Sequence, residues 1–490
     1  MKLSLAKTLV AILAIGIPAA AATCESLASL TLPDTTVTAA ETISKGANTG
    51  DIKFCRVAAT LKPSSDSDIK IEVWMPASGW NGNFQAVGNG GWSGNIATTA
   101  MAEALRRGYA TASTDTGHEG ASANFALGHP EKLIDYAWRS EHEMTVQAKA
   151  IIGAFYGNGP KLSYWNGCSA GGKQALKEAQ KFPEDFDGII AGAPGNNWTG
   201  RAIYSMWVAQ AVHKDETSYI PPEKYPLIHN AVLEACDTLD GVKDGLIEDP
   251  TRCHFDPKVL ECKSGDNATC LTTAQVEAAR KIYSGAINPR TKQQIFPGME
   301  PGSELNWNVL ASPRPFAIGS DHFKFVVFKD PNWDYKTMNF DSDVALAEKT
   351  DNGLINAMDP NLRPFFGHGG KLIQYHGWSD WQISPLNSVH YYESVAEKMG
   401  GAAKVQDSYR LFMAPGMGHC GGSEGPNTFD MVGALEQWVE KSKPPVQIVA
   451  SKISNGKVER TRPLCPYPQI AKYKGAGSID DAASFACALP

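Results

Sequence analysis

The chain has 490 residues, which exceeds a typical single domain, and 43% of them are hydrophobic, which is enough to fill a large core. Its formal net charge of −7 argues against nucleic acid or an anionic membrane as a partner and fits a water-soluble protein. One core with a large insertion, or two domains, is therefore expected.

The N-terminus has the features of an export signal. Lys2 and Lys7 precede an apolar run over residues 9–17, and small residues follow at 19–22. This order predicts a secretory signal peptide over residues 1–22. The apolar run is too short to span a bilayer. We therefore expect a soluble mature protein that is secreted or periplasmic.

Short apolar runs with the composition of buried strands recur along the chain, and helical segments separate several of them. This alternation predicts a mostly parallel sheet with helices on both faces, which places the chain in the α/β class. The predicted strands cover residues 69–75, 84–88, 109–114, 162–165, 188–191, 371–375 and 409–413.

The stretch Gly167-Cys168-Ser169-Ala170-Gly171 lies between the predicted strand at 162–165 and a predicted helix at 173–181 that ends before Pro183. Small residues on both sides of the serine allow a tight turn that exposes its hydroxyl above a sheet. The Gly-x-Ser-x-Gly pattern alone is common. Its position between a strand and a helix favours Ser169 as a nucleophile.

Asp380 and His419 follow two later strands and complete the chain order Ser, Asp, His that such hydrolases use. Taken singly, an aspartate at this place more often caps a turn, and a histidine in a glycine-rich loop is more often solvated. Three such residues at the carboxyl ends of three strands are far less often accidental. We therefore predict a triad of Ser169, Asp380 and His419.

Acyl transfer also needs donors for the oxyanion. The backbone N–H of Ala170, which follows the nucleophile, is the first expected donor. The second is expected from the glycine-rich loop at residues 88–91, where small residues let the backbone approach a substrate.

An acidic loop with two turn glycines covers residues 236–246. Calcium needs several oxygen ligands around a tight turn, and neighbouring aspartates repel one another unless an ion neutralises them. The spacing differs from an EF-hand, and a solvated acidic loop is the alternative. The expected ligands are the carboxylates of Asp237, Asp240 and Asp244 with the carbonyls of Val242 and Leu246.

Ten cysteines, an even number in an exported chain, predict a set of disulfides. Cys168 and Cys420 adjoin the proposed nucleophile and the proposed base. A bridge between them would tie these two side chains together, whereas buried thiols or bridges to other cysteines are the alternatives.

Residues 197–360 differ from the rest of the chain, because they hold four cysteines, the acidic loop, several prolines and many aromatic residues. This segment interrupts the predicted sheet between Ser169 and Asp380. We predict an inserted lid domain at 197–360, with residues 23–196 and 361–490 forming the catalytic domain.

In these features the chain resembles the tannase and feruloyl esterase family of secreted α/β-hydrolases, which also contains the mono(hydroxyethyl) terephthalate hydrolases. The matching motifs are Cys-Ser-x-Gly-Gly at 168–172, Tyr-His-Gly-Trp-Ser-Asp at 375–380, Pro-Gly-Met-Gly-His-Cys at 415–420 and Arg-Pro-Leu-Cys-Pro-Tyr-Pro at 462–468. The resemblance implies an α/β-hydrolase fold with a large inserted lid domain, and gives the triad residues the same three roles. It also implies structural Ca²⁺ at the acidic loop, and Gly88, with Gly90 next, as the second oxyanion donor. The disulfides that it implies are Cys24–Cys55, Cys168–Cys420, Cys236–Cys253, Cys262–Cys270 and Cys465–Cys487.

The activity that follows is two-step hydrolysis of esters of aromatic acids, with feruloyl esters first, galloyl esters second and terephthalate monoesters third. The partner is a small aromatic ester, including esters attached to plant polysaccharide or tannin, and no organic or redox cofactor is implied. His376 and Ile383, near the acid, are expected to contact substrate, and Arg314 is a candidate partner for a substrate carboxylate. The alternative from another class is a secreted phenolic- or carbohydrate-binding protein with an inactive hydrolase fold, which three intact triad positions oppose.

Overall fold

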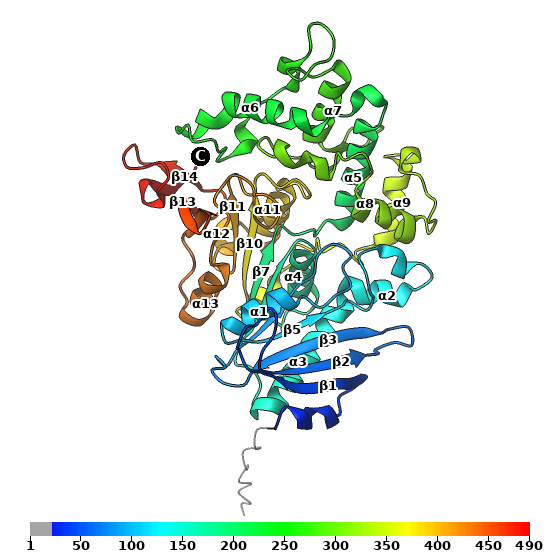
Figure 1. The fold of residues 1–490 in the computed structure, drawn as a ribbon, viewed down its shortest axis with the longest axis vertical. Helices are drawn as coiled ribbons and strands as arrows, with labels where there is room; N and C mark the ends of the chain where they lie inside the picture. Colours follow the sequence, from blue (N-terminus) through cyan, green and yellow to red (C-terminus); the bar gives the residue numbers. More distant parts are fainter. Residues whose placement is uncertain (1–21) are drawn as a thin grey trace, which may run out of the picture.

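The structure is a computed structural model and describes residues 22–490, so the predicted signal peptide at 1–22 lies, apart from its last residue, outside the described residues. A nine-stranded sheet in the order β1-β2-β3-β5-β4-β6-β7-β10-β11 forms the centre of the molecule (Figure 1). Its strands are β1 (Thr35–Ile43), β2 (Phe54–Leu61), β3 (Ile69–Pro76), β4 (Phe84–Val87), β5 (Ala110–Thr114), β6 (Ser163–Cys168), β7 (Gly188–Gly192), β10 (Lys371–Gly377) and β11 (Tyr409–Ala414).

The sheet is parallel from β5 to β11 and antiparallel from β1 to β5. The prediction of a mostly parallel sheet is therefore confirmed for the part that carries the proposed site. Register aligns the carboxyl ends of four strands, because Cys168 pairs with Gly192 and Gly377 pairs with Ala414. The residues that follow β6, β10 and β11 consequently meet at one edge.

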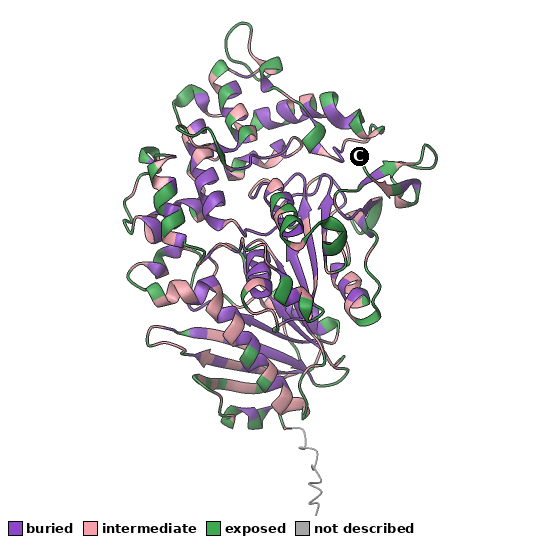
Figure 2. Ribbon diagram, turned by 180° about the vertical axis from the view of Figure 1, so that it is seen from behind, coloured by how far each residue is buried: buried purple, intermediate pink, exposed green. Residues whose placement is uncertain are grey.

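Helices cover both faces of this sheet. Because successive side chains of a strand point to opposite faces, neighbouring residues of one strand contact different helices. On β7, Ile189 and Ala191 pack in a cluster with α3 (Ser140–Tyr156), α4 (Ala170–Lys181) and α11 (Leu386–Met399). Ile190, between them, packs in a cluster with α1 (Thr98–Arg106) and α13 (Met431–Lys441) on the opposite face. Figure 2 shows the central strands buried and the outer faces of the helices exposed.

Between β7 and β10 the chain forms a separate layer above the carboxyl ends of the parallel strands (Figure 1). This layer, here called the insert, has its own hydrophobic core, which includes Trp307 and Phe323 and is joined by Phe328, Trp333 and Tyr335. Many of the aromatic residues noted in this segment of the sequence therefore pack inside the insert. Its elements are α5 (Trp198–Val212), α6 (Tyr225–Cys236), α7 (Thr273–Ser284), β8 (Ala286–Ile287), β9 (Gln294–Phe296), α8 (Ala317–Asp321) and α9 (Ser342–Asp351).

The last part of the chain, although predicted to belong to the catalytic domain, does not extend the central sheet. Two hairpins instead follow α13, one of β12 (Ile448–Ser454) with β13 (Lys457–Leu464) and one of β14 (Ile470–Tyr473) with β15 (Phe485–Ala488). Three short helices, α2 (Pro130–Ile134), α10 (Arg363–Gly367) and α12 (Ala402–Val405), complete the fold. Among the helices of residues 22–490, none has the length and apolar character needed to cross a membrane.

All ten cysteines are paired, and the five disulfides are those that the resemblance implied. The Cys24–Cys55 bridge ties the start of the described chain to β2, and Cys465–Cys487 ties the two C-terminal hairpins together. Cys236–Cys253 and Cys262–Cys270 close short loops of the insert.

Candidate active site

Ser169 lies at the turn between β6 and α4, with φ 64° and ψ −119°. A non-glycine residue adopts a positive φ only under strain or in a special turn, as is expected of a serine at a tight strand-to-helix turn. The helix begins at Ala170, three residues before the predicted start, and its first residues approach neighbouring backbone closely. A Cβ on Gly172 would lie 2.4 Å from the carbonyl oxygen of Gly192, so glycine is required there.

The three predicted triad residues are linked by hydrogen bonds in the expected order, from serine to histidine to aspartate. The Oγ–H of Ser169 donates to Nε2 of His419 at 2.8 Å. The Nδ1–H of His419 donates to Oδ2 of Asp380 at 2.7 Å. This set requires the tautomer of His419 in which Nε2 is free to accept a proton, which is the arrangement that activates a serine hydroxyl.

Asp380 is fully buried and surrounded by donors. Its Oδ1 accepts the backbone N–H groups of Gln382 at 2.7 Å and Ile383 at 3.1 Å, and its Oδ2 also accepts from Nε2 of His376 at 2.9 Å. Burial alone would raise the pKa of Asp380, but the charges and hydrogen bonds of His419 and His376 hold it well below its usual range. Asp380 therefore stays ionised beside His419.

His376 and Ile383 do not have the exposed positions expected of substrate contacts. His376 is 0% exposed and contacts Oδ2 of Asp380, the same oxygen as His419 does, while its Nδ1 lies 2.7 Å from Oγ of Ser388. Ile383 is 1% exposed and packs with the core of the insert. The structure thus gives His376 a positioning role, which sequence reasoning could not separate from substrate contact because both need a residue near the acid.

The expected oxyanion donors also need one correction. The N–H of Gly88 donates to the carbonyl of Asn166 at 3.2 Å, so the pairing of β4 with β6 already uses it. The N–H of Asn89 donates to Gln174 at 2.9 Å. Gly90 is the first residue of this loop whose N–H has no acceptor among the described residues, and its Cβ position faces open space. Ala170 opens α4, where an N–H has no partner inside the helix.

The Cys168–Cys420 disulfide joins the residue before Ser169 to the residue after His419, with a Cα–Cα distance of 6.0 Å. The two cysteines are 252 residues apart in sequence. The bridge therefore links the segments that carry the nucleophile and the base directly.

Replacing both Cys168 and Cys420 by alanine should lower kcat/KM by about a hundredfold, because a shift of about 1 Å between reacting groups costs that much. Loss of the crosslink should also destabilise the fold by about 4–5 kcal/mol in the chain-entropy view. Removal of the remote Cys24–Cys55 pair is the matched control and should cost stability without a comparable loss of turnover in folded enzyme. Equal activity losses in the two double variants would contradict a special role for the bridge at the site.

An aromatic cluster adjoins the nucleophile on the side of the insert. Gly195 donates its N–H to the carbonyl of Ser169 at 3.0 Å, and the Cβ position of Gly195 lies 3.4 Å from the ring of Trp198. Trp92 packs against Trp198 with ring centroids 4.9 Å apart and against Tyr136 at 4.6 Å. Sequence reasoning missed these residues because they come from three separate segments.

Arg201 on α5 is a buried cation without an acidic partner. It is 2% exposed, and its Nε and Nη1 have no acceptor among the described residues. The guanidinium lies over the rings of Trp198 and Phe316, 5.4 and 5.2 Å from their centroids. Burial lowers the pKa of Arg201 to about 10, so it stays charged at neutral pH. Arg314, the expected carboxylate partner, is instead exposed.

The acidic loop lies at the boundary between the insert and the C-terminal hairpins. Asp237 accepts the N–H groups of Asp244 and Gly245 at 3.0–3.1 Å, and Asp244 pairs with Arg462 of β13. Burial, first, and the charges of Asp244 and Asp237 raise the pKa of Asp240. The possible metal ligands of this loop are all oxygen atoms, which suits calcium. The carboxylates are farther apart than an ion would hold them, because among the described residues only one group, in another part of the molecule, has its possible ligand atoms within 4.8 Å of one another.

This loop is near the triad in space, although it is far from it in sequence. The side chain of Leu246 lies 2.5 Å from the Cβ position of Gly416, in the loop that carries His419. A pocket of about 760 Å³ lies elsewhere, between α5 and α7 beside Trp207 and Phe340, and includes no triad residue.

The parallel sheet, with a serine at the turn into α4 and a histidine and an aspartate after later strands, defines an α/β-hydrolase. The predicted fold class is therefore confirmed.

Comparisons with known proteins agree. The sequence model described as "Tannase and feruloyl esterase" matches residues 55–488. An uncharacterised esterase of Xanthomonas campestris is 38% identical, over 96% of this chain and 91% of the relative, and a probable feruloyl esterase B-2 of Neosartorya fischeri is 36% identical, over 94% and 90%. The crystal structure of feruloyl esterase B from Aspergillus oryzae superposes with a TM-score of 0.90 at 33% identity, covering 95% of this chain and 99% of that one. A tannin acyl hydrolase from Aspergillus niger shares the fold, with a TM-score of 0.81 at 21% identity over 94% and 93% of the two chains.

The chain belongs to the tannase and feruloyl esterase family, as the resemblance indicated. It is a carboxylic ester hydrolase, which decides against an inactive binding protein.

Proposed function

We propose that the chain hydrolyses esters of phenolic acids through an acyl-enzyme formed on Ser169. The observation that carries this proposal is the continuous hydrogen-bonded set from Ser169 through His419 to the buried, ionised Asp380. His419 accepts the serine proton at Nε2 as Oγ attacks the ester carbonyl, and Asp380 stabilises the positive charge that develops on the imidazole.

The N–H groups of Ala170 and Gly90 then hold the oxyanion, because neither has an acceptor among the described residues. Gly90 lies beside the nucleophile turn, since the carbonyl of the preceding Asn89 accepts the N–H of Gly171 at 2.7 Å. Collapse of the tetrahedral intermediate breaks the ester C–O bond, and His419 gives its proton to the departing alcohol. Water attacks the acyl-enzyme in the same way, with its proton passing to His419 and then to Ser169 as the acid leaves.

Feruloyl esters are the proposed substrates. Trp92, Tyr136 and Trp198 pack around Ala170, so an apolar aromatic surface adjoins the nucleophile and suits a flat acyl group. Relatives named probable feruloyl esterases are 36% identical to the chain, and the solved feruloyl esterase B is 33% identical. The substrate can be a free ester or one attached to plant polysaccharide, with galloyl esters of tannin ranking second.

The test is a comparison of kcat/KM for methyl ferulate, methyl gallate and a terephthalate monoester with the full-length mature enzyme. We expect methyl ferulate to be hydrolysed with the highest kcat/KM. A preference of tenfold or more for methyl gallate would replace the feruloyl assignment by that of a tannase.

Terephthalate monoesters rank third, and Arg201 is the reason to test them. A buried guanidinium with unused donors beside aromatic rings suits the free carboxylate of such a substrate. Arg201→Gln should then raise KM for the monoester at least tenfold and leave KM for methyl ferulate little changed. Equal changes for the two substrates would count against carboxylate recognition by Arg201.

We also propose that the insert acts as a lid over the active site, since α5 carries Trp198 and Arg201 to the side of the nucleophile. Export is supported by the five disulfides, which form in an oxidising compartment.

The acidic loop is proposed to bind structural calcium through Asp237, Asp240, Asp244 and the carbonyls of Val242 and Leu246. Because calcium would bind the folded state only, chelation should lower Tm, and calcium at 100 times its Kd should stabilise the fold by about 2.7 kcal/mol. Asp240→Asn should reduce this calcium-dependent shift in differential scanning calorimetry. Glu234→Gln, an exposed carboxylate on the preceding helix, is the matched control and should keep it.

Activity should fall together with stability on chelation, since Leu246 packs against the loop of His419. A Tm that changes neither with chelator nor with added calcium would contradict calcium binding by this loop.

A further inference from the structure

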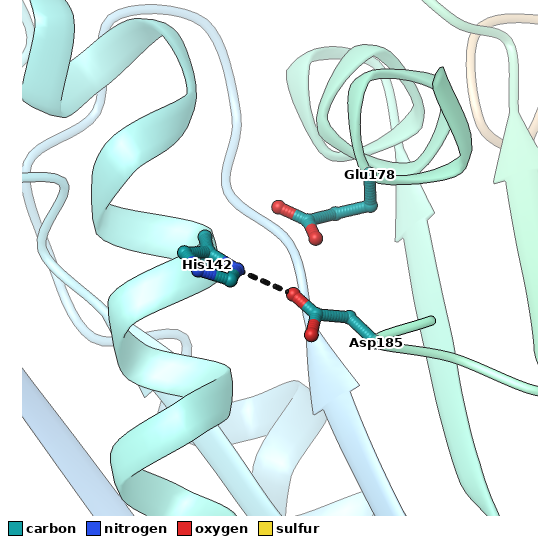
Figure 3. A group of neighbouring side chains, drawn as sticks. All are labelled: His142, Glu178 and Asp185. Carbon is teal, nitrogen blue, oxygen red and sulfur yellow. Dashed lines mark hydrogen bonds and ion pairs between the residues drawn. The ribbon is translucent and has the colours of Figure 1, made fainter. Parts of the chain in front are cut away.

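A second group of ionisable side chains lies on the far side of α4 from the active site. His142 comes from α3, Glu178 from the last turns of α4, and Asp185 from the loop before β7 (Figure 3). One possible ligand atom from each lies within 4.8 Å of the others. Glu178 is nine residues after Ser169, about 13 Å along the helix, so this group takes no part in the ester chemistry.

Glu178 is the unusual member of the group. It is 1% exposed, and neither of its carboxylate oxygens has a hydrogen-bond partner among the described residues. A buried carboxylate without a partner is strongly unfavourable unless a proton or a cation neutralises it. Figure 3 shows this carboxylate pointing from α4 towards His142 and Asp185.

Among the described residues, no lysine near Glu178 neutralises its carboxylate by an ion pair. The Nζ of Lys149 donates to the backbone carbonyl of Asp185 at 2.5 Å, and Lys173 donates to backbone carbonyls before α3. Neither lysine forms an ion pair with Glu178 in the described structure.

We infer that His142, Glu178 and Asp185 form a binding site for a divalent transition-metal ion, with Zn²⁺ as the best-suited ion. One imidazole nitrogen with two carboxylates is a borderline donor set of the kind that zinc accepts, and a water can supply the fourth ligand. His142 and Asp185 have side-chain exposures of 27% and 14%, so the site is open to solvent on one side.

The present geometry needs only a small adjustment. Nδ1 of His142 lies 2.6 Å from Oδ2 of Asp185, whereas ligands of a tetrahedral zinc ion lie about 3.4 Å apart. The half-buried ring of His142 can supply this change. A bound ion would then clamp α3, the end of α4 and the loop before β7 together.

The test uses tag-free mature enzyme in excess calcium at pH 7.5, titrated with zinc chloride by calorimetry. We expect one zinc ion per chain, and a loss of affinity of at least tenfold in Glu178→Gln and in His142→Gln. His129→Gln is the matched control, because His129 also pairs with an aspartate, Asp66, but on the surface and without a third ligand. It should bind zinc like the wild type.

Glu178→Gln removes the unpartnered charge, so without zinc its Tm should equal or exceed that of the wild type, and zinc should raise Tm only in the wild type. Crystals soaked in zinc should show an anomalous peak between the three side chains. Unchanged affinity in both Glu178→Gln and His142→Gln, or a complete lack of zinc binding by the wild type, would overturn the inference and leave a proton as the group that neutralises Glu178. Loss of the titration in Asp240→Asn alone would overturn it as well, by placing the zinc in the acidic loop.

Discussion

Ser169→Ala should lower kcat for methyl ferulate on the order of 10⁶-fold, because loss of the nucleophile removes the acyl-enzyme route altogether. Folding should be unaffected, since the change removes one oxygen whose only hydrogen bond in the structure goes to His419. The measurement is kcat under saturating substrate, together with Tm.

Ser163→Ala is the matched control, because Ser163 lies on β6, the strand that leads to the nucleophile, six residues before it, and should leave kcat near the wild-type value. Covalent labelling by a fluorophosphonate should occur in this control and be lost in Ser169→Ala. Turnover above about one per cent of wild type in Ser169→Ala would remove the serine from the mechanism.

Asp380→Asn should lower kcat by about 10⁴-fold while the fold persists. Two histidines donate to Oδ2 of Asp380. An asparagine at this position would either turn its NH₂ group towards these two donors or turn its oxygen towards them without the negative charge. The tautomer of His419 that can accept the serine proton would then no longer be favoured. His376→Gln, which removes one donor but keeps the carboxylate, should cost much less activity.

The same aspartate sets a stability effect with a defined sign. Its folded pKa lies below the value of about 3.9 for an unfolded aspartate, so ionised Asp380 stabilises the fold above about pH 4. This stabilisation is lost as the pH falls through the lowered pKa. The Tm of wild type and of Asp380→Asn should therefore differ most at neutral pH and converge in strong acid. A difference that grows below pH 4 would contradict the assigned ionisation.

Much of the fold could be predicted because strand composition and turn residues are local properties. The predicted strands at 69–75, 188–191 and 409–413 agree with β3, β7 and β11 to within one residue at each end. The antiparallel edge formed by β1 and β2 was not predicted. On β1, half-buried and exposed residues alternate only over the first five positions, and no residue of this strand is buried, so its sequence carries a weak strand signal.

The substrate side of the site could not be predicted in the same way. Trp92, Tyr136, Trp198 and Arg201 come from a loop, a helical turn and α5, and their proximity depends on how the insert folds over the sheet. Nothing in the residues next to Arg201 in sequence indicates that its guanidinium is buried without an acid. The same holds for Glu178, because the neighbouring His142 and Asp185 come from two other segments.

The sequence by itself determined the order of the proposed triad and the strand–turn–helix setting of Ser169, because each is carried by a short motif. The pairing of the cysteines beside this serine was implied only by the family resemblance. Only the tertiary structure decided that Gly88 uses its N–H within the sheet, that His376 holds Asp380 from inside, and that the acidic loop packs against the loop of His419. The physical reason is that an N–H group usually donates to a single acceptor, and a buried side chain packs against one particular set of neighbours. Which acceptor and which neighbour depend on segments that are hundreds of residues apart in the chain.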